Sequence, residues 1–494
     1  MTPSKYQAAI YETFQNTDEN ITISAVAGSG KTTVLLELLK LVPRGKSALF
    51  LAFNNSIVDE LKSRIRLRDG VEIMTIHSYG WHSIMRRYGS KVKMNPNKSF
   101  GKIEKILKKH EDILAKKRGW YFYIIPKIID LLRCNLLDAT AENINKLADY
   151  HDLVVTEKEI DVAIEVFRLM NKDKSQFDFM DMIYQPYADT TIRRKKYDYV
   201  FCDESQDFSI AQQDIISGAL NRRGRLITVG DPCQAIYGFA GADTDSYDKL
   251  SNLNGESIAL PLSVCYRCAR AIVIEAQEIV PQIQYAPDAE MGCVTKGSLL
   301  DLDRGDWVLC RNLKPLVETY LWLMKNKIKS KIKGKDIGEG IIALIHKTGA
   351  KTIRGLNHLL DVEKTKLFKK LKEKGVKHPL SHPKVELFEQ RMDVINCLML
   401  EVNTVADLIK LIQDIFTDDV KGIMLSTIHK AKGLENDKVF FLCPELIPSK
   451  FATQPWQYEQ ERNLRYVCIT RAKKELVYVD GSTFKQDLLR QIYI

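Results

Sequence analysis

The sequence predicts an α/β protein with two cores, each built on a parallel sheet and each interrupted by a mainly helical insertion. Three observations support this fold class. Short apolar runs alternate with helix-like segments, as in a parallel sheet covered by helices on both faces. Two long segments, residues 81–187 and 335–420, are rich in lysine and poor in strand-like runs. A chain of 494 residues is also too long for one hydrophobic core.

The first core is expected in two parts, residues 1–85 and 191–260, on either side of a helical insertion at 86–190. It opens with a helix-like stretch at 4–14, and a glycine-rich turn at 28–30 joins its first strand to an apolar helix. Its strands are expected where short apolar runs occur. These runs are 21–27, 48–53, 72–76, 197–202 and 225–229, and the apolar helix is 33–41.

The second core is expected at residues 261–334 and 421–494, around a reduced helical accessory insertion at 335–420. Its strand-like runs are short and apolar, like those of the first core. They are 307–311, 422–426, 438–442 and 475–479.

The composition is that of an ordinary globular protein, with 45% hydrophobic and 28% charged residues. No apolar run approaches the roughly 18 residues of a membrane-spanning helix. The first 14 residues lack the apolar region of a signal peptide, so a cytoplasmic location is expected. The net charge of +10 suits a polyanionic partner, although most basic proteins of this size are simply soluble.

The ten cysteines agree with a cytoplasmic location. Several of them end apolar runs, as buried thiols in strands do. One Cys-x-x-Cys pair is present, Cys265 and Cys268, and no second pair stands at zinc-like spacing, so a zinc site is not expected.

A phosphate-binding loop is predicted between the first strand and the apolar helix. Residues 25–32 read Ala-Val-Ala-Gly-Ser-Gly-Lys-Thr, in the strand–loop–helix context that such a loop requires. Backbone N–H groups of the loop and of the helix N-terminus can cradle phosphates. Lys31 would reach the β and γ phosphates, and the Thr32 hydroxyl would bind Mg²⁺. The residues expected to form the cradle are Ala27, Gly28, Ser29 and Gly30.

An acidic pair follows the apolar run at 197–202. Asp203 can hold Mg²⁺ through its water shell, while Glu204 can polarise the water that attacks a phosphate. A carboxylate pair after a strand is often only a solvated loop. Beside a phosphate-binding loop, it favours nucleotide hydrolysis over binding alone.

Further motifs follow one another in a fixed order over nearly the whole chain. They are Tyr6-Gln7, Ala52-Phe53-Asn54, Thr75-Ile76-His77, Asp203-Glu204-Ser205-Gln206-Asp207, the run Gly-Asp-Pro-Cys-Gln-Ala-Ile-Tyr-Gly-Phe at 230–239, Tyr266-Arg267, Arg311-Asn312, the run Thr-Ile-His-Lys-Ala-Lys-Gly-Leu-Glu at 427–435 and the run Glu-Arg-Asn-Leu-Arg-Tyr-Val-Cys-Ile-Thr-Arg-Ala at 461–472. Together with the phosphate-binding loop, they resemble the motifs of the UvrD, Rep and PcrA branch of superfamily 1 DNA helicases.

This resemblance implies two RecA-like motor domains and an ATP-dependent helicase that moves 3′-to-5′ on single-stranded DNA, with ATP and Mg²⁺ as cofactors. In the family pattern Gln234 senses the γ phosphate, and Arg267 and Arg471 are arginine fingers. The remaining nucleotide contacts implied by the resemblance are Gln7 and Tyr266 to adenine, Glu435 to the ribose, and Thr33 at a position where several members have an arginine that helps to hold adenine.

The resemblance also implies contacts with single-stranded DNA across both cores. Aromatic side chains there would stack on bases without regard to sequence, although aromatic and histidine side chains in such motifs can equally be structural. Phe239 stands where the family usually has tryptophan. The implied DNA contacts are Phe53, Asn54, Thr75, His77, Tyr237, Phe239, Thr427 and His429.

The accessory insertion of about 85 residues is roughly half the size expected from the resembled enzymes. The resemblance therefore supports translocation along DNA more strongly than separation of the duplex strands. The overall length and layout resemble the helicase subunits of the Gabija anti-phage system, which work with an OLD-family nuclease. The alternatives are a DNA-gated ATPase that signals to a partner with little unwinding of its own, and a stand-alone DNA repair helicase.

Overall fold

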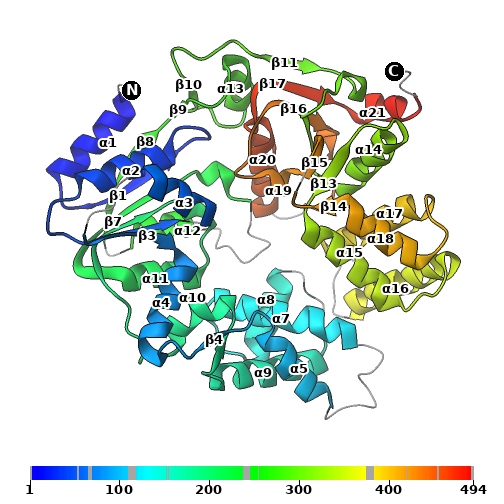
Figure 1. The fold of residues 1–494 in the computed structure, drawn as a ribbon, viewed down its shortest axis with the longest axis horizontal. Coiled ribbons are helices and arrows are strands. Elements are labelled where there is room, and N and C mark those ends of the chain that lie inside the picture. The colour runs from blue at the N-terminus through cyan, green and yellow to red at the C-terminus, as the bar shows by residue number, and fades with distance from the viewer. Residues whose placement is uncertain are drawn as a thin grey trace. The chain divides into compact units, whose positions relative to one another are not determined.

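The computed structural model describes residues 3–52, 55–64, 69–108, 118–151, 153, 155–236, 245–253, 255–373, 383–419, 421–452 and 455–490. The chain forms two compact units, Met1–Cys265 and Tyr266–Ile494. Each unit contains a parallel sheet and a group of mainly helical insertion elements (Figure 1). The fold class predicted from the sequence is therefore confirmed. No helix among the described residues is long and apolar enough to cross a membrane.

The first unit is built on a six-stranded sheet whose neighbouring strands all pair in parallel. Its order is β3-β2-β6-β7-β1-β8, so β3 and β8 are the edge strands. The strands are β1 (Asn20–Ala25), β2 (Ala48–Ala52), β3 (Val71–Thr75), β6 (Tyr197–Cys202), β7 (Leu220–Gly230) and β8 (Ser257–Leu262).

Apolar side chains cover both faces of this sheet, as the continuous apolar runs predict. The helices of this core are α1 (Lys5–Asn16), α2 (Lys31–Leu41), α3 (Asn55–Arg64), α4 (Ile76–Tyr88), α11 (Ile210–Ala219) and α12 (Ser246–Ser251), with the short 3₁₀ helices η3 (Ser205–Asp207) and η4 (Pro232–Gln234). In β2, Phe50 packs on one face with α1, α2 and α3, whereas Leu49 and Leu51 pack on the other with α4, α11 and the helix Phe179–Ala188 (α10).

The insertion of the first unit has a hydrophobic core of its own. Side chains such as Ile103, Ile128 and Phe167 pack with one another, and their cluster contains no residue of the six-stranded sheet. Its elements are β4 (Lys93–Met94), α5 (Lys98–Leu107), α7 (Arg118–Cys134), α8 (Ala141–Tyr150), α9 (Glu157–Lys172), β5 (Gln176–Phe177) and α10 (Phe179–Ala188). Figure 1 shows α5, α7, α8 and α9 as a group at the far end of α4 and α10 from the sheet.

The second unit is built on a seven-stranded parallel sheet of order β11-β17-β16-β12-β15-β13-β14. Its strands are β11 (Cys293–Lys296), β12 (Trp307–Cys310), β13 (Ser330–Lys333), β14 (Phe416–Thr417), β15 (Ile423–Thr427), β16 (Asn436–Leu442) and β17 (Ala472–Val479). Its remaining elements are α13 (Arg270–Gln277), β10 (Gln284–Tyr285), η6 (Leu299–Asp301), α14 (Leu313–Lys325), α19 (Ile428–Ala431), η8 (Pro444–Leu446), α20 (Pro455–Ile469) and α21 (Gly481–Leu488).

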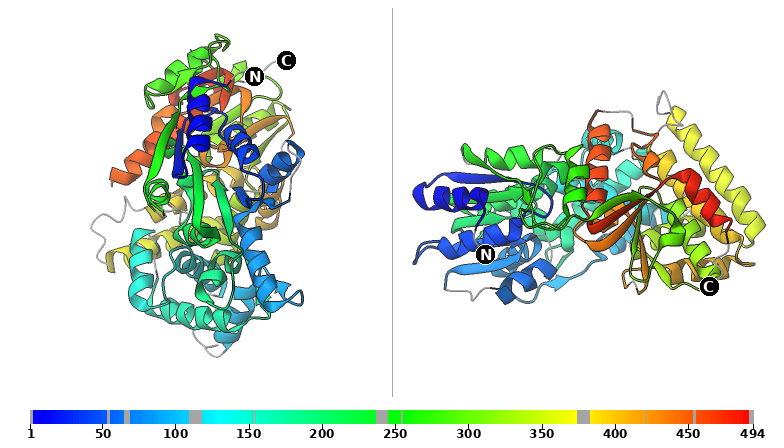
Figure 2. Two further views of the ribbon diagram at one scale, coloured as in Figure 1. Left: turned by 90° about the vertical axis from the view of Figure 1, so that its left-hand side faces the viewer. Right: turned by 90° about the horizontal axis from the view of Figure 1, so that it is seen from above.

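The insertion of the second unit does not have a separate core. Leu356 and Leu398 of the insertion belong to one apolar cluster with Val308 and Leu425 of the sheet. Its helices are α15 (Lys335–Thr348), α16 (Ile353–Glu373), α17 (Pro383–Met399) and α18 (Val405–Ile415). The longest of them, α16, is the yellow helix at the right-hand edge of the second view in Figure 2.

Candidate nucleotide site

The predicted phosphate-binding loop lies between β1 and α2. Gly28 and Gly30 have φ values of 66° and 80°, which favour glycine because a Cβ atom strains this conformation. The hydroxyl of Ser29, which is fully buried, donates to the carbonyl of Val26 at 2.8 Å and fixes the loop from inside. Helix α2 begins at Lys31, two residues before the position expected from the sequence. Its first-turn N–H groups are therefore those of Lys31 and Thr32, at the end of the helix where anions bind.

The two predicted acidic residues lie beside this loop. Nζ of Lys31 is 3.3 Å from Oε1 of Glu204, and the Thr32 hydroxyl donates to Oδ2 of Asp203 at 3.0 Å. A hydroxyl next to a carboxylate is a ligand set that Mg²⁺ accepts. The residues therefore fit the implied ion, with Thr32 and Asp203 as the side chains that would hold it.

Burial controls the charges in this site. It raises the pKa of the Asp203 carboxyl, which is 2% exposed, and the neighbouring Glu204 raises it further. Burial also opposes the charge on Lys31, but the carboxylates of Glu204, Asp231 and Asp203 together outweigh it and raise the Lys31 pKa. The lysine is consequently a fixed cation among carboxylates, and phosphate oxygens could replace those carboxylates as its partners.

Gln206 joins the acidic pair to the segment that contains the predicted γ-phosphate sensor. Its Nε2 donates to Oε2 of Glu204 at 2.6 Å, and its Oε1 accepts from the backbone N–H of Asp231 at 3.0 Å. Asp231 in turn accepts a hydrogen bond from Nε2 of Gln234 at 2.6 Å. A chain of hydrogen bonds thus runs from Glu204 to Gln234, and sequence reasoning assigned no role to Gln206 in it.

Gly230 permits this close approach. A Cβ atom at this position would lie 2.4 Å from Oγ of Ser205 and 2.8 Å from Oε1 of Gln206. Both contacts are shorter than non-bonded atoms tolerate, so any larger residue would push β7 away from η3. The glycine that opens the predicted sensor motif is therefore required by packing.

Two of the predicted adenine contacts lie at the loop. Nε2 of Gln7 would be 3.8 Å from a Cβ atom built on Gly30, and Cβ of Thr33 would be 4.0 Å from it. The Oε1 atom of Gln7 accepts from the backbone N–H of Ser4 in a capping box, which orients the side chain. Gln7 and Thr33 therefore lie on the same side of the loop.

The remaining predicted nucleotide contacts belong to the second unit. Arg267 forms an ion pair with Glu435, and its Nη1 donates to the carbonyl of Thr470 at 3.4 Å. Arg471 is buried, and it donates to the carbonyls of Val467 and Leu434 at 3.0 Å each. Both arginines are thus fixed by contacts within this unit.

Tyr266, by contrast, is 47% exposed, so its ring is accessible. This exposure suits a side chain that stacks on a ligand.

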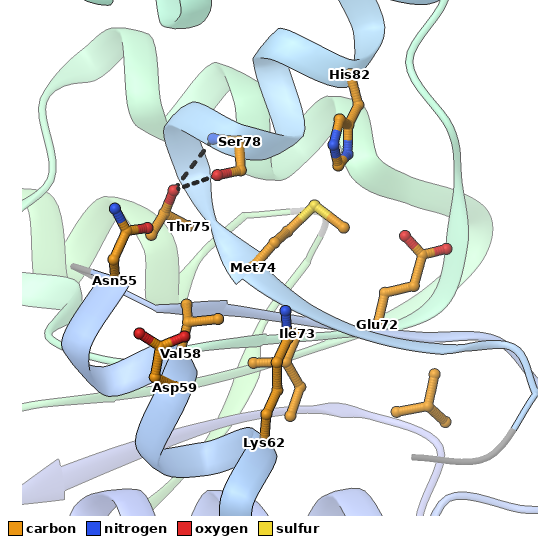
Figure 3. Close-up of a pocket in the computed structure, with 11 residues that line it drawn as sticks. Asn55, Val58, Asp59, Lys62, Glu72, Ile73, Met74, Thr75, Ser78 and His82 are labelled. Carbon is orange, nitrogen blue, oxygen red and sulfur yellow. Dashed lines mark hydrogen bonds between the residues drawn. The ribbon is translucent and has the colours of Figure 1, made fainter.

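Two of the predicted DNA contacts of the first unit lie at the start of α4. Thr75 is the N-cap of this helix, and its hydroxyl accepts from the backbone N–H of Ser78 at 3.1 Å. Burial lowers the pKa of His77, so this imidazole is neutral near pH 7. Thr75 and Ser78 also line a cavity of about 630 Å³ along the edge strand β3 (Figure 3), and Asn55 at the start of α3 lines it too.

Phe179 is an aromatic residue that sequence reasoning missed. Its ring lies 6.5 Å from that of His77, and the side chain is 56% exposed. The spacing to the buried residues Met182, Ile183 and Pro186 would assign Phe179 to the apolar face of α10. It stands in the first turn of the helix, and the periodicity alone does not reveal its exposure.

In the second unit, Thr427 is the N-cap of α19, and His429 lies within that helix. Burial, together with the charges of Arg311 and Lys432, lowers the pKa of His429 to about 3. The other four expected DNA contacts, Phe53, Asn54, Tyr237 and Phe239, lie outside the described residues. Among the described residues, no three His, Cys, Asp or Glu side chains group as a metal cluster would require.

Comparisons with known proteins place the chain among DNA helicases. The UvrD/REP helicase N-terminal domain model matches residues 6–254, and the UvrD-like helicase C-terminal domain model matches residues 314–480. F-box DNA helicase protein 1 of Schizosaccharomyces pombe is 23% identical over 535 aligned positions, which cover 97% of this chain and 57% of that protein. The ATP-dependent DNA helicase PcrA of Staphylococcus aureus is 27% identical over 297 positions, covering 54% of this chain and 39% of PcrA.

The chain therefore spans only 39% to 57% of the length of these relatives. A crystal structure of the arterivirus helicase, nonstructural protein 10, aligns with 95% of this chain and 61% of the viral chain, at 12% identity and a TM-score of 0.35.

Proposed function

Because the chain belongs to the UvrD/Rep helicase family, we propose that it hydrolyses ATP and uses the energy to move 3′-to-5′ along single-stranded DNA. One observation carries the proposal most directly. The phosphate-binding loop, a lysine, a hydroxyl and two carboxylates converge within hydrogen-bonding distance in the first unit, through the Lys31–Glu204 and Thr32–Asp203 contacts.

The chemistry follows from these positions. Lys31 neutralises charge on the β and γ phosphates, and the N–H groups of the loop hold the phosphates in place. Thr32 and Asp203 would hold Mg²⁺, which supplies further charge neutralisation when bound. Glu204 orients a water molecule and accepts its proton as the water attacks the γ phosphorus. The bond to the bridging oxygen then breaks, and ADP leaves with that electron pair.

The second unit supplies two further cationic groups in this proposal. Arg267 and Arg471 would stabilise charge on the transferred phosphoryl group, an effect of about 10³ to 10⁵ in rate for arginine fingers. Each must first give up its present partners, which include Glu435 and the carbonyl of Thr470 for Arg267 and two backbone carbonyls for Arg471. Hydrolysis in this scheme depends on a conformational change, which is what a motor needs to couple chemistry to movement.

The DNA path in the first unit would include Thr75, His77 and the exposed ring of Phe179. A neutral imidazole and an exposed phenyl ring side by side suit stacking with bases, which requires no particular sequence. Asn55 and Ser78, on the walls of the neighbouring cavity, offer polar groups for the backbone of the strand.

We also propose, from the reduced accessory insertion, that the chain acts as the helicase subunit of a Gabija-type anti-phage complex with an OLD-family nuclease. The insertion helices run from Lys335 to Ile415, a short span for an accessory domain that separates duplex strands. A DNA-gated ATPase with little unwinding of its own, acting on a partner, would have the same architecture.

The deciding experiment measures ATP turnover and strand separation by the purified chain, with and without single-stranded DNA, alone and with an OLD-family nuclease. DNA-stimulated turnover supports the motor assignment, and 3′-tailed duplexes unwound in preference to 5′-tailed ones support the polarity. Turnover that single-stranded DNA does not change would refute the motor assignment. Turnover or cleavage that the nuclease partner leaves unchanged would refute the complex.

A further inference from the structure

Arg311 is the centre of a buried group of charges in the second unit that the chemistry proposed above does not use. Its Nη2 lies 2.8 Å from Oε1 of Glu461, and its Nε lies 3.3 Å from both oxygens of that carboxylate. Its Nη1 lies 3.1 Å from Oε1 of Glu386. The three side chains are between 10% and 14% exposed. One guanidinium therefore holds two carboxylates at once, largely away from water.

The three residues come from three different parts of the unit. Arg311 follows β12, in the middle of the seven-stranded sheet. Glu386 lies on α17 of the accessory insertion, and Glu461 lies on α20, which ends at Ile469, two residues before Arg471. The cluster thus joins the sheet and the insertion to the helix that leads into one of the proposed arginine fingers.

Ser449 reinforces the same connection. Its backbone N–H donates to Oε2 of Glu461 at 3.0 Å, and its hydroxyl donates to Oε1 of Glu386 at 2.9 Å. Ser449 and Arg311 therefore each contact both carboxylates, and Arg311 supplies the positive charge between them. Burial and the charge of Glu461 raise the pKa of Glu386, as expected for two buried acids near one base. A shift of α17 would therefore act on Glu461 through Arg311 and Ser449.

The packing around the cluster makes such a shift consequential. Insertion and sheet share one hydrophobic core, so α17 cannot move independently of its surroundings. Helix α19, which contains His429, packs against α20, and the charge of Arg311 contributes to the lowered pKa of His429. A predicted nucleotide contact and a predicted DNA contact therefore both lie next to the helix that Glu461 anchors.

We propose that Arg311 is a positioning residue that couples the accessory insertion to α20, so that the position of the insertion controls the rate of ATP hydrolysis. The insertion is then a control element of the motor: whatever displaces α17 changes turnover through Glu386, Arg311 and Glu461. This inference rests on the proposed function, because Arg471 must take part in hydrolysis for the position of α20 to matter.

The test is Glu386→Gln, with Glu389→Gln as the matched control on the same helix. The glutamine keeps the length of the side chain and an acceptor for Ser449, but it removes the charge that binds Arg311. Glu389 pairs at 2.9 Å with Lys364 of the neighbouring insertion helix α16, so its substitution leaves the coupling intact. With saturating DNA we expect Glu386→Gln to lower kcat about fivefold or more, while KM for ATP stays within about twofold. Glu389→Gln should behave as the wild type.

A second comparison tests whether the two carboxylates act through the same guanidinium. Glu461→Gln should also lower kcat, and the loss in the double variant should be smaller than the product of the two single losses. Multiplicative losses would overturn the shared role of Arg311. An unchanged kcat in Glu386→Gln, or a loss that merely follows the folded fraction in a thermal melt, would overturn the coupling.

Lys31→Ala separates failure of the inference from failure of the proposed function. If Lys31→Ala is inactive and Glu386→Gln is unaffected, only the coupling is wrong. If Lys31→Ala retains turnover, the nucleotide assignment is wrong and the coupling falls with it.

Discussion

Replacing Gln206 with methionine tests the hydrogen-bond chain between Glu204 and the predicted γ-phosphate sensor. Methionine has nearly the same length and is apolar, so it fills the buried space without offering a donor or an acceptor. The substitution removes the 2.6 Å hydrogen bond to Glu204 and leaves the backbone N–H of Asp231 without its side-chain acceptor.

The size of the effect follows from these two bonds. A hydrogen bond to a charged group contributes about 1.5 to 3 kcal/mol. If this bond holds the Glu204 carboxylate in place for proton transfer, its loss lowers kcat by about ten- to 150-fold, since 1.36 kcal/mol is a factor of ten. The buried N–H of Asp231, left without its acceptor, should cost about 1 to 3 kcal/mol of folding stability.

The assay is DNA-stimulated ATP turnover at saturating ATP, with KM for ATP and the melting temperature measured in parallel. Gln213→Met is the matched control, because Gln213 is a buried amide on α11 whose Nε2 donates to the carbonyl of Phe208. We expect a loss in kcat in Gln206→Met alone, with KM within about threefold. A kcat within threefold of wild type, or equal losses in both variants, would refute the positioning of Glu204 by Gln206.

Three further predictions concern charge, stacking and pH. Glu204→Gln should bind ATP and DNA but reduce turnover by at least about 10³-fold, because an amide cannot take the proton from water. Filter binding measures the affinities and phosphate release measures the turnover; rapid turnover would contradict the role of Glu204 as proton acceptor. Phe179→Ala should weaken the binding of single-stranded DNA by about 1 to 3 kcal/mol. The melting temperature should not change, because the ring is exposed. Fluorescence anisotropy measures the DNA affinity, and a wild-type affinity would exclude stacking of Phe179 on a base. The pKa of His429 is lowered to about 3, so the folded state resists its protonation and loses stability as the pH falls below about 6.5. Between pH 7.5 and 5.5 the wild type should lose up to about 1.4 kcal/mol more than His429→Gln in denaturant unfolding, and parallel curves would refute this.

Local patterns in the sequence predicted the fold, and the glycine-rich loop lies between a strand and a helix as expected. The run at 197–202 coincides with β6, since a parallel strand buried on both faces is a continuous apolar run. The first strand was expected at 21–27 but ends at Ala25, because the apolar residues after it already belong to the glycine-rich loop. Strand β8 was not expected, because Pro261 lies within its apolar run and a proline argues against a strand unless the strand is at the edge of a sheet, as β8 is.

Contacts between distant segments could not be predicted in this way. Gln206 meets Asp231 across 25 residues, and Arg311 meets Glu461 across 150. No local periodicity encodes such pairs, since they exist only after the strands have assembled. The DNA contacts expected at Phe53 and Phe239 lie outside the described residues and stay predictions.

The first insertion has its own apolar cluster and the second shares the cluster of its sheet, and this difference determines how each insertion should unfold. A segment with its own apolar cluster can open as one cooperative subunit while the rest stays folded, whereas a segment that shares its cluster cannot. The amide hydrogens of helices α5, α7, α8 and α9 should therefore exchange together, at a lower free energy than those of the six-stranded sheet. The amide hydrogens of helices α15 to α18 should exchange only when those of β12 and β15 also exchange. A destabilising substitution in the accessory insertion should therefore unfold the whole second unit.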